Sequence, residues 1–405
     1  MSKLEELIQQ YCPDGVEYKK VKDVYKRLKG TPITAGKMKE IATPDGSVRV
    51  FAGGKTVIDA NEEDIPNANI TRVPAVLVQS RGVIDVVYYD KPFTFKNEMW
   101  AYTASNQVSV KFLYYVLKNN IQTFRDAASG MGSLPQISLG VTEDFSVPVP
   151  PLPVQEEIVR ILDAFASYTA ELQAELQAEL QARKEQYNYY RDKLLSFNKL
   201  RGGQIEVKWL KMGEIASIRT GRRFVRTDIK ESGVPCFHYG DLYTYYGLTA
   251  THTKGYLDEK LASKLRFAQP NDVVVVCAGE NDMDLGVGVA WLGDEPAVVH
   301  DACCILHHDQ NPRYISHFLR THNYHLQMKK YVKNGKISSL PASGLAEAII
   351  PIPPLEEQER IANILDRFDS LTNDLTAGLP AEIEKRRQQY EYYRDKLLTF
   401  KRKEA

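Results

Sequence analysis

The chain has 405 residues with 52 basic and 52 acidic side chains, so its formal net charge at pH 7 is zero. This balance excludes a polycation that coats nucleic acid through charge alone. A composition of 43% hydrophobic and 26% charged residues is typical of a globular protein, and the length allows two to four domains.

The composition also predicts the cellular setting. No run approaches the roughly 18 apolar residues that a membrane span needs, and the start, Met1-Ser2-Lys3-Leu4-Glu5-Glu6, does not resemble a signal sequence. The five cysteines are scattered, which disfavours a disulfide framework. We therefore expect a cytoplasmic protein with reduced cysteines and no membrane association.

An internal repeat organises the chain. Residues 147–197 match residues 350–400 without a gap at an offset of 203, and 29 of the 51 positions are identical. Outside these segments the two halves have little in common. The sequence therefore predicts two half-proteins in tandem: variable domains at 1–150 and 203–353, and constant segments at 151–202 and 354–405.

The constant segments are predicted to be long helices. After the prolines at 148, 150, 151 and 153, the stretch 154–201 lacks Gly and Pro and carries an apolar stripe. Within it, Ala-Glu-Leu-Gln occurs three times over 170–181, and each tetrad lengthens the helix by about 6 Å. The second copy is the expected antiparallel partner, with a break at Ala377-Gly378-Leu379-Pro380.

Both variable domains show the same order of strand-like and helix-like segments. In the first, strands are expected at 48–51, 75–78 and 83–89 and a helix at 111–126; in the second, strands are expected at 273–276, 287–291 and 303–306 and a helix at 314–331. The predicted fold class is α+β: two similar mixed α/β domains in pseudo-twofold tandem, separated by two long antiparallel helices.

Motifs for catalysis or metal binding are incomplete. Gly53-Gly54-Lys55-Thr56 resembles the end of a phosphate-binding loop, but that loop requires a glycine where Arg49 stands. His300, Cys303, Cys304, His307 and His308 form one local cluster, whereas zinc sites use ligand pairs from two separate places. A buried strand is the favoured interpretation of this cluster, so neither a catalytic nor a metal site is predicted.

Basic residues cluster locally in the variable domains. Arginines surround Gly221 at positions 219, 222, 223 and 226, and lysines surround Gly335 at 329, 330, 333 and 336. Arginine and lysine in loops suit phosphate contact and the reading of guanine edges. A solvated surface explains the same charges equally well, and the two-domain architecture is what favours DNA as the ligand.

The repeated motifs resemble those of a known family. Pro-Pro-Leu before each helix, the endings Gln186-Tyr187-Asn188-Tyr189-Tyr190-Arg191-Asp192 and Gln389-Tyr390-Glu391-Tyr392-Tyr393-Arg394-Asp395, and the tetrad repeat are similar to those of specificity subunits of type I restriction-modification enzymes, most of all the IC group. The resemblance covers essentially the whole chain. It is specific in the helical segments and weak in the variable domains.

The resemblance implies a non-catalytic subunit for phage defence. The variable domains would be target recognition domains, each reading one half of a bipartite, asymmetric site in double-stranded DNA. The helices would set the spacer between the half-sites and dock two methyltransferase subunits, which motor-nuclease restriction subunits join. This chain would hold no cofactor, since S-adenosylmethionine, ATP and Mg would be bound by the partner subunits.

The resemblance also implies site residues. The loops that would approach DNA are expected to use Lys55, Arg81, Lys96 and Ser133 for the first half-site. For the second half-site, the expected residues are Arg222, Arg223, Tyr239, Asn281 and Lys336. Tyr187, Tyr190, Tyr390 and Tyr393 are expected either to face the methyltransferase or to pack between the helices.

Two other functional classes remain open at this point. A non-enzymatic scaffold would use the same helices to join two protein-binding domains. A self-contained modifying enzyme would need a methyltransferase or nuclease motif, which the sequence does not show.

Overall fold

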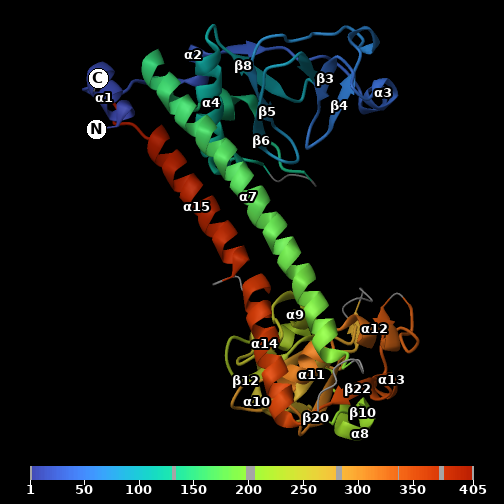
Figure 1. Ribbon diagram of the computed structural model, residues 1–405. Coiled ribbons are helices and arrows are strands. Elements are labelled where there is room, and N and C mark those ends of the chain that lie inside the picture. The colour runs from blue at the N-terminus through green and yellow to red at the C-terminus, as the bar shows by residue number, and fades with distance from the viewer. Residues whose placement is uncertain are drawn as a thin grey trace. The chain divides into compact units, whose positions relative to one another are not determined.

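The computed structural model describes residues 2–129, 134–197, 206–279, 285–335, 337–373 and 378–403. The chain forms two compact units: unit 1 comprises residues 1–172 and 385–405, and unit 2 comprises residues 173–384. Each unit contains one variable domain together with parts of the long helices α7 (Leu152–Leu195) and α15 (Leu379–Leu398), and unit 2 also contains α14 (Leu355–Asn373) (Figure 1).

The variable domain of unit 1 is built on two small sheets. Its strands are β1 (Tyr18–Lys20), β2 (Lys26–Leu28), β3 (Val48–Phe51), β4 (Val57–Ala60), β5 (Ala75–Gln79), β6 (Asp85–Tyr89), β7 (Phe93–Phe95), β8 (Trp100–Thr103) and β9 (Ser146–Pro148). Its helices are α1 (Lys3–Tyr11), α2 (Val21–Val24), α3 (Ala35–Ile41), η1 (Glu62–Asp64), α4 (Gln107–Asn119), α5 (Ile121–Asp126) and α6 (Leu139–Glu143).

The strand order contains two hairpins, β3–β4 and β5–β6, one in each sheet. One sheet has the order β2-β8-β5-β6 with antiparallel neighbours, and the other has the order β4-β3-β7, in which β3 and β7 are parallel. A separate pair, β1 and β9, joins the beginning of the domain to its end. Because β5 is buried along its whole length, it reads as a continuous apolar run in the sequence.

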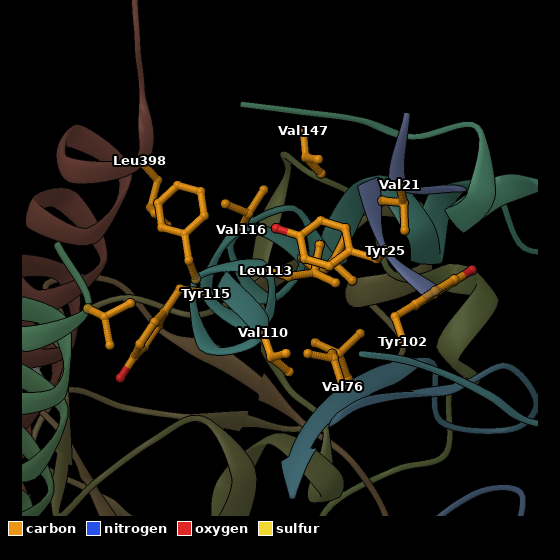
Figure 2. Packing of buried hydrophobic residues seen from close by; sticks show 14 of the residues in the cluster. Val21, Tyr25, Val76, Tyr102, Val110, Leu113, Tyr115, Val116, Val147 and Leu398 are labelled. Atoms are coloured by element: carbon orange, nitrogen blue, oxygen red, sulfur yellow. The ribbon is translucent and has the colours of Figure 1, made fainter. Parts of the chain in front are cut away.

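Helix α4 forms the centre of the largest core of unit 1. Val110, Leu113 and Val116 of this helix are buried against Val76 and neighbouring strand residues. Figure 2 shows these side chains together with Leu398 of α15, which belongs to the same cluster. Each fully buried aliphatic side chain of this kind stabilises the fold by about 1.5–3 kcal/mol.

The variable domain of unit 2 is larger but similar. Its strands are β10 (Lys208–Lys211), β11 (Ala216–Thr220), β12 (Val234–Phe237), β13 (Thr249–Ala250), β14 (Gly255–Leu257), β15 (Phe267–Ala268), β16 (Val273–Val276), β17 (Ala278–Gly279), β18 (Gly288–Trp291), β19 (Ala297–Val299), β20 (Cys303–His308), β21 (Ser338–Ser339) and β22 (Ile349–Ile352). Its helices are α8 (Met212–Ile215), η2 (Arg226–Asp228), α9 (Tyr239–Thr244), α10 (Glu259–Ala262), α11 (Pro312–Phe318), α12 (His322–Met328) and α13 (Ala342–Ala346).

The two domains share one topology. The order β11-β20-β16-β18 in unit 2 repeats β2-β8-β5-β6 of unit 1, and β14-β12-β19, with β12 and β19 parallel, repeats β4-β3-β7. The pair β10 and β22 likewise repeats β1 and β9. The prediction that the variable domains are divergent copies of one fold is therefore confirmed.

Several predicted helices differ in their limits. The helix expected at 111–126 is two helices that meet at Asn120, and the one expected at 314–331 is also two, with Thr321 as the N-cap of α12. The long helix α7 begins at Leu152, two residues before the predicted start, because Pro153 is tolerated in a first helical turn. It ends at Leu195, before the predicted end at 201, because Ser196 and Phe197 are not helical and Phe197 has a φ of +39°; residues 198–201 lie outside the described residues.

The second constant segment is interrupted where the sequence predicts a break. Helix α14 ends at Asn373 and α15 begins at Leu379, with Pro380 in its first turn. Residues 374–377 lie outside the described residues. Among the described residues, no helix is long and apolar enough to cross a membrane.

The repeated helices exchange equivalent contacts. In unit 1, the Phe165 ring of α7 stacks on Tyr393 of α15 at a centroid distance of 6.0 Å. In unit 2, Tyr190 of α7 stacks on Phe368 of α14 at 5.7 Å. Phe368 is the repeat equivalent of Phe165, and Tyr393 is the repeat equivalent of Tyr190. Each unit therefore contains the same phenylalanine–tyrosine pair, with one ring from the first copy of the repeat and one from the second. Two repeated helices that pack antiparallel form such reciprocal pairs.

Each domain is attached to these helices by an aspartate at the same repeat position. In unit 1, Asp163 of α7 accepts hydrogen bonds from Lys111 Nζ at 2.7 Å and from Tyr115 at 2.5 Å, both on α4. In unit 2, the equivalent Asp366 of α14 pairs with Arg313 at 2.5 Å and His317 at 2.8 Å, both on α11. The domain helix therefore presents two donors, four residues apart, to one carboxylate in both units.

Candidate nucleic-acid interface

In the first variable domain, the turns of the hairpins β3–β4 and β5–β6 lie beside the connection from β7 to β8, and hydrogen bonds join them. We call residues 52–56, 80–84 and 96–99 the tip cluster. Gly54 N–H donates to the Arg81 carbonyl at 2.9 Å, and Lys96 N–H donates to the Phe51 carbonyl at 2.9 Å. Gly54 and Gly82 have φ of +70° and +79°, which a side chain would strain, and a Cβ on Gly82 would lie 3.5 Å from Gly54 Cα.

The tip cluster brings together three of the four residues predicted for the first half-site. Lys55 and Arg81 are exposed on adjacent tips. Lys96 is less available, since its Nζ lies 3.0 Å from Glu98 Oε1 and its side chain is 21% exposed. Ser133 lies outside the described residues.

Two backbone hydrogen bonds of this region recur in the second domain. His300 N–H donates to the Phe237 carbonyl at 3.1 Å, as Lys96 N–H does to Phe51, and Cys303 N–H donates to the His300 carbonyl as Met99 N–H does to Lys96. These bonds make Lys96 and His300 structural equivalents, although the surrounding sequences share no identity.

A pocket of about 670 Å³ opens at this place in unit 2. Five of its thirteen lining residues carry aromatic rings and two are arginines: it is lined by Arg223, Phe224, Val225, Arg226, His238, Tyr239, Tyr243, Ala278, Gly279, His300, Asp301, Ala302 and Ile337. Aromatic faces and guanidinium groups are the surfaces that stack on bases and contact phosphates. The two domains thus share a backbone and differ in the chemistry of its exposed loops.

The residues predicted for the second half-site divide into three groups. Arg223 and Tyr239 line the pocket. Arg222 is exposed beside it but its Nη1 donates to the Lys264 carbonyl at 2.7 Å, so this guanidinium is partly used within the domain. Asn281 and Lys336 lie outside the described residues.

Sequence reasoning missed two histidines of this pocket as components of the interface. The rings of His238 and His300 lie 4.9 Å apart, and burial lowers the pKa of both imidazoles, so they are predominantly neutral at pH 7. Backbone N–H groups of Gly240 and Ala302 donate to their Nδ1 atoms at 3.4 and 3.1 Å. Their proximity depends on the pairing of β12 with β19, which no local pattern predicts.

Four of the five residues of the cysteine and histidine cluster lie in strand β20, whereas His300 precedes the strand and lines the pocket. Cys303 and Cys304 are buried, at 0% and 1% exposure, and His307 Nδ1 lies 2.7 Å from Asp272 Oδ1. The interpretation as a buried strand is therefore confirmed for Cys303, Cys304 and His308, while His307 of the same strand is exposed.

The four tyrosines predicted to face a partner or to pack between the helices occupy two kinds of position. Tyr187 is buried and its hydroxyl lies 3.1 Å from His317 Nδ1, whereas Tyr390 is half-buried beneath Arg394. Tyr190 and Tyr393 stack through one face and remain 38% and 41% exposed. The exposed pair keeps surface that another protein could cover.

Comparisons with known proteins agree with this architecture. The model of a family described as the type I restriction modification DNA specificity domain matches residues 13–182 and 204–385. The chain is 34% identical over 312 residues to a type I restriction enzyme specificity subunit of Escherichia coli, covering 74% of this chain and 73% of that protein. It is 31% identical over 324 residues to a putative type I restriction enzyme specificity subunit of Haemophilus influenzae, covering 76% and 77%.

Solved structures show the same fold at low sequence identity. One chain, from a structure describing complex assembly and conformational transition of the type I R-M system, has a TM-score of 0.64 at 16% identity and covers 95% of this chain and 98% of that one. The HsdS subunit from Thermoanaerobacter tengcongensis has a TM-score of 0.51 at 15% identity, with 96% and 97% covered.

Proposed function

The chain belongs to the type I restriction-modification DNA specificity family, and we propose that each of its variable domains reads one half of a bipartite, asymmetric site in double-stranded DNA. The observation that carries this proposal is the shared framework with different loops. The two variable domains have the same topology, and equivalent backbone hydrogen bonds hold the same turn in each. The side chain at the equivalent position differs, since it is Lys96 in the first domain and His300 in the second. A protein that reads two different short sequences needs this combination.

The charges of the loops support contact with DNA. Lys55 and Arg81 are exposed on the tip cluster, and Arg223 and Arg226 line the pocket of the second domain. Phosphate contacts would position the duplex, while the neighbouring polar and aromatic side chains would read base edges. The chain's zero net charge limits the strength of this binding, so tight binding would need basic surface from partner subunits.

The partners follow from the family. We propose that the helices α7, α14 and α15 dock two methyltransferase subunits, which motor-nuclease subunits join, and that these partners bind S-adenosylmethionine, ATP and Mg. The exposed faces of Tyr190 and Tyr393 support this role for the helices, because large aromatic surface is enriched in protein interfaces. The chain itself would supply recognition and no catalysis.

Methylation mapping tests the proposal. The chain is co-expressed with a type I methyltransferase subunit, and methylated adenines are sequenced in cells with and without this chain. We expect one bipartite motif that appears only with the chain, and recovery of the methyltransferase when the chain is purified. Absence of both results would reject the proposal and favour a protein-binding scaffold.

A further inference from the structure

A carboxylate lies among the basic residues of the tip cluster. Glu98 Oε1 accepts a hydrogen bond from Gly53 N–H at 3.3 Å and lies 3.0 Å from Lys96 Nζ. The Glu98 backbone carbonyl in turn accepts a hydrogen bond from the Ser80 hydroxyl. The side chain is therefore held by Gly53 and Lys96, the backbone of Glu98 is held by Ser80, and the side chain remains 28% exposed.

The acid has one oxygen available. Oε1 is used by Gly53 and Lys96, whereas none of the described residues donates a hydrogen bond to Oε2. A carboxylate accepts hydrogen bonds and donates none, and its charge repels phosphate. On a surface that faces DNA, such a group is suited to a hydrogen-bond donor on a base edge.

Two of the four bases offer such a donor in the major groove. Cytosine N4 and adenine N6 are exocyclic amino groups, while guanine and thymine present acceptors there. A fixed carboxylate therefore discriminates between bases on one strand, attracting an amino group and rejecting the carbonyl oxygen that replaces it.

The second domain lacks an acid at the equivalent position. The bond from Met99 N–H to the Lys96 carbonyl corresponds to that from Cys303 N–H to the His300 carbonyl, so Glu98 matches Ala302. The cation that Glu98 pairs with, Lys96, corresponds to a buried histidine. This turn therefore carries different charges in the two domains.

We propose that Glu98 is a specificity-determining residue for the first half-site, where it accepts a hydrogen bond from the exocyclic amino group of one base in the major groove. This inference rests on the proposed function and names the chemistry of one contact. Lys96 and the Gly53 backbone position the carboxylate, and the exposed Lys55 and Arg81 beside it would hold the DNA backbone.

Two substitutions test the contact in the complex with the methyltransferase. Glu98→Gln keeps an oxygen for Gly53 N–H, and its amide pairs with adenine N6 and N7. Glu98→Ala removes the acceptor. The readouts are the methylated motif in cells and kcat/KM for oligonucleotides that carry each of the four bases at each position of the first half-site.

We expect one position of that half-site to require cytosine or adenine in the wild type. Glu98→Ala should lower the preference at this position by about 5- to 150-fold, and Glu98→Gln should shift it toward adenine. Because adenine and cytosine are separate substrates in the assay, it also shows which amino group is read. The second half-site should be unchanged in both variants.

Glu143→Gln is the matched control, since Glu143 pairs with Arg27 at 3.0 Å and is 24% exposed but lies on α6. A bipartite motif that stays identical in both Glu98 variants would overturn the role of Glu98 and leave the proposed function intact. Equal loss of methylation at all sequences, with the methyltransferase still bound, would also overturn it. If the wild-type chain directs no motif, the proposed function itself fails.

Discussion

Replacing Asp366 with alanine should weaken the attachment of the second domain to helix α14. Asp366 receives hydrogen bonds from His317 and Arg313 of α11, and His317 is completely buried. Tyr187 extends this hydrogen-bond network, because its hydroxyl lies 3.1 Å from His317 Nδ1. The tyrosine donates to Nδ1, and Nε2–H donates to the carboxylate, so the substitution leaves a buried donor without a partner.

The expected loss follows from what each partner retains. An unsatisfied buried donor costs about 1–3 kcal/mol. Arg313 keeps Glu359 and Asn363 as partners, so its share is about 0–1 kcal/mol. The sum, about 1–4 kcal/mol, should appear in unit 2 alone.

Hydrogen exchange of the full chain measures this loss locally. Peptides from α11 and α14 should exchange faster by between about 5-fold and 800-fold, while peptides from α4 in unit 1 keep their rates. The equivalent Asp163→Ala should accelerate α4 instead, by less, since Lys111 keeps a cation–π contact with Tyr88. Unchanged protection of α11 in Asp366→Ala would refute the reasoning that this buried network secures the domain.

Other outcomes follow from the same structure. Burial lowers the pKa of His317, and the hydrogen bond to Asp366 offsets only part of this effect. As the pH falls, the imidazole is therefore protonated in the unfolded chain before it is protonated in the folded one. The free energy of unfolding of unit 2 should decrease below about pH 6.5, which urea unfolding at a series of pH values measures. Deleting residues 174–177 shortens α7 by about 6 Å, and methylation mapping should show a gap shorter by almost two base pairs with both half-sites kept; an unchanged gap would contradict the helix as a ruler. Replacing residues 203–350 with the matching domain of another family member should alter one half of the motif only. Arg81→Ala should weaken binding of the assembled complex to all DNA sequences alike. The slope of log binding constant against log salt concentration should become shallower by about one, whereas a change of the methylated motif would argue for a base contact.

The helices and most strands could be predicted because their signals are local. The stripe of α7, the proline at the start of α15 and the apolar runs of β3, β5 and β16 each depend on neighbouring residues in the chain. The interruption of α4 and α5 at Asn120 was missed, since the apolar pattern continues across it.

The candidate interface was predictable only where a loop carries its own signal. Gly53-Gly54-Lys55 is recognisable as a glycine-rich turn, and its approach to Arg81 agrees with the residues chosen from the family. The equivalence of Lys96 and His300 depends on the parallel pairs β3–β7 and β12–β19, formed by strands far apart in the sequence. Glu98 resembled an ordinary solvated acid until its bond to Gly53 placed it among the tips.

The bonds that hold these turns join backbone atoms, so they impose little demand on the side chains they carry. The hydrogen bond from Lys96 N–H to the Phe51 carbonyl and that from His300 N–H to the Phe237 carbonyl are equivalent, although a lysine donates one and a histidine the other. Substitutions in these turns can therefore accumulate at small cost to folding, provided that the strands behind them keep their buried faces. For a protein whose use depends on recognising new sequences, this separation lets selection alter the target while the scaffold stays constant.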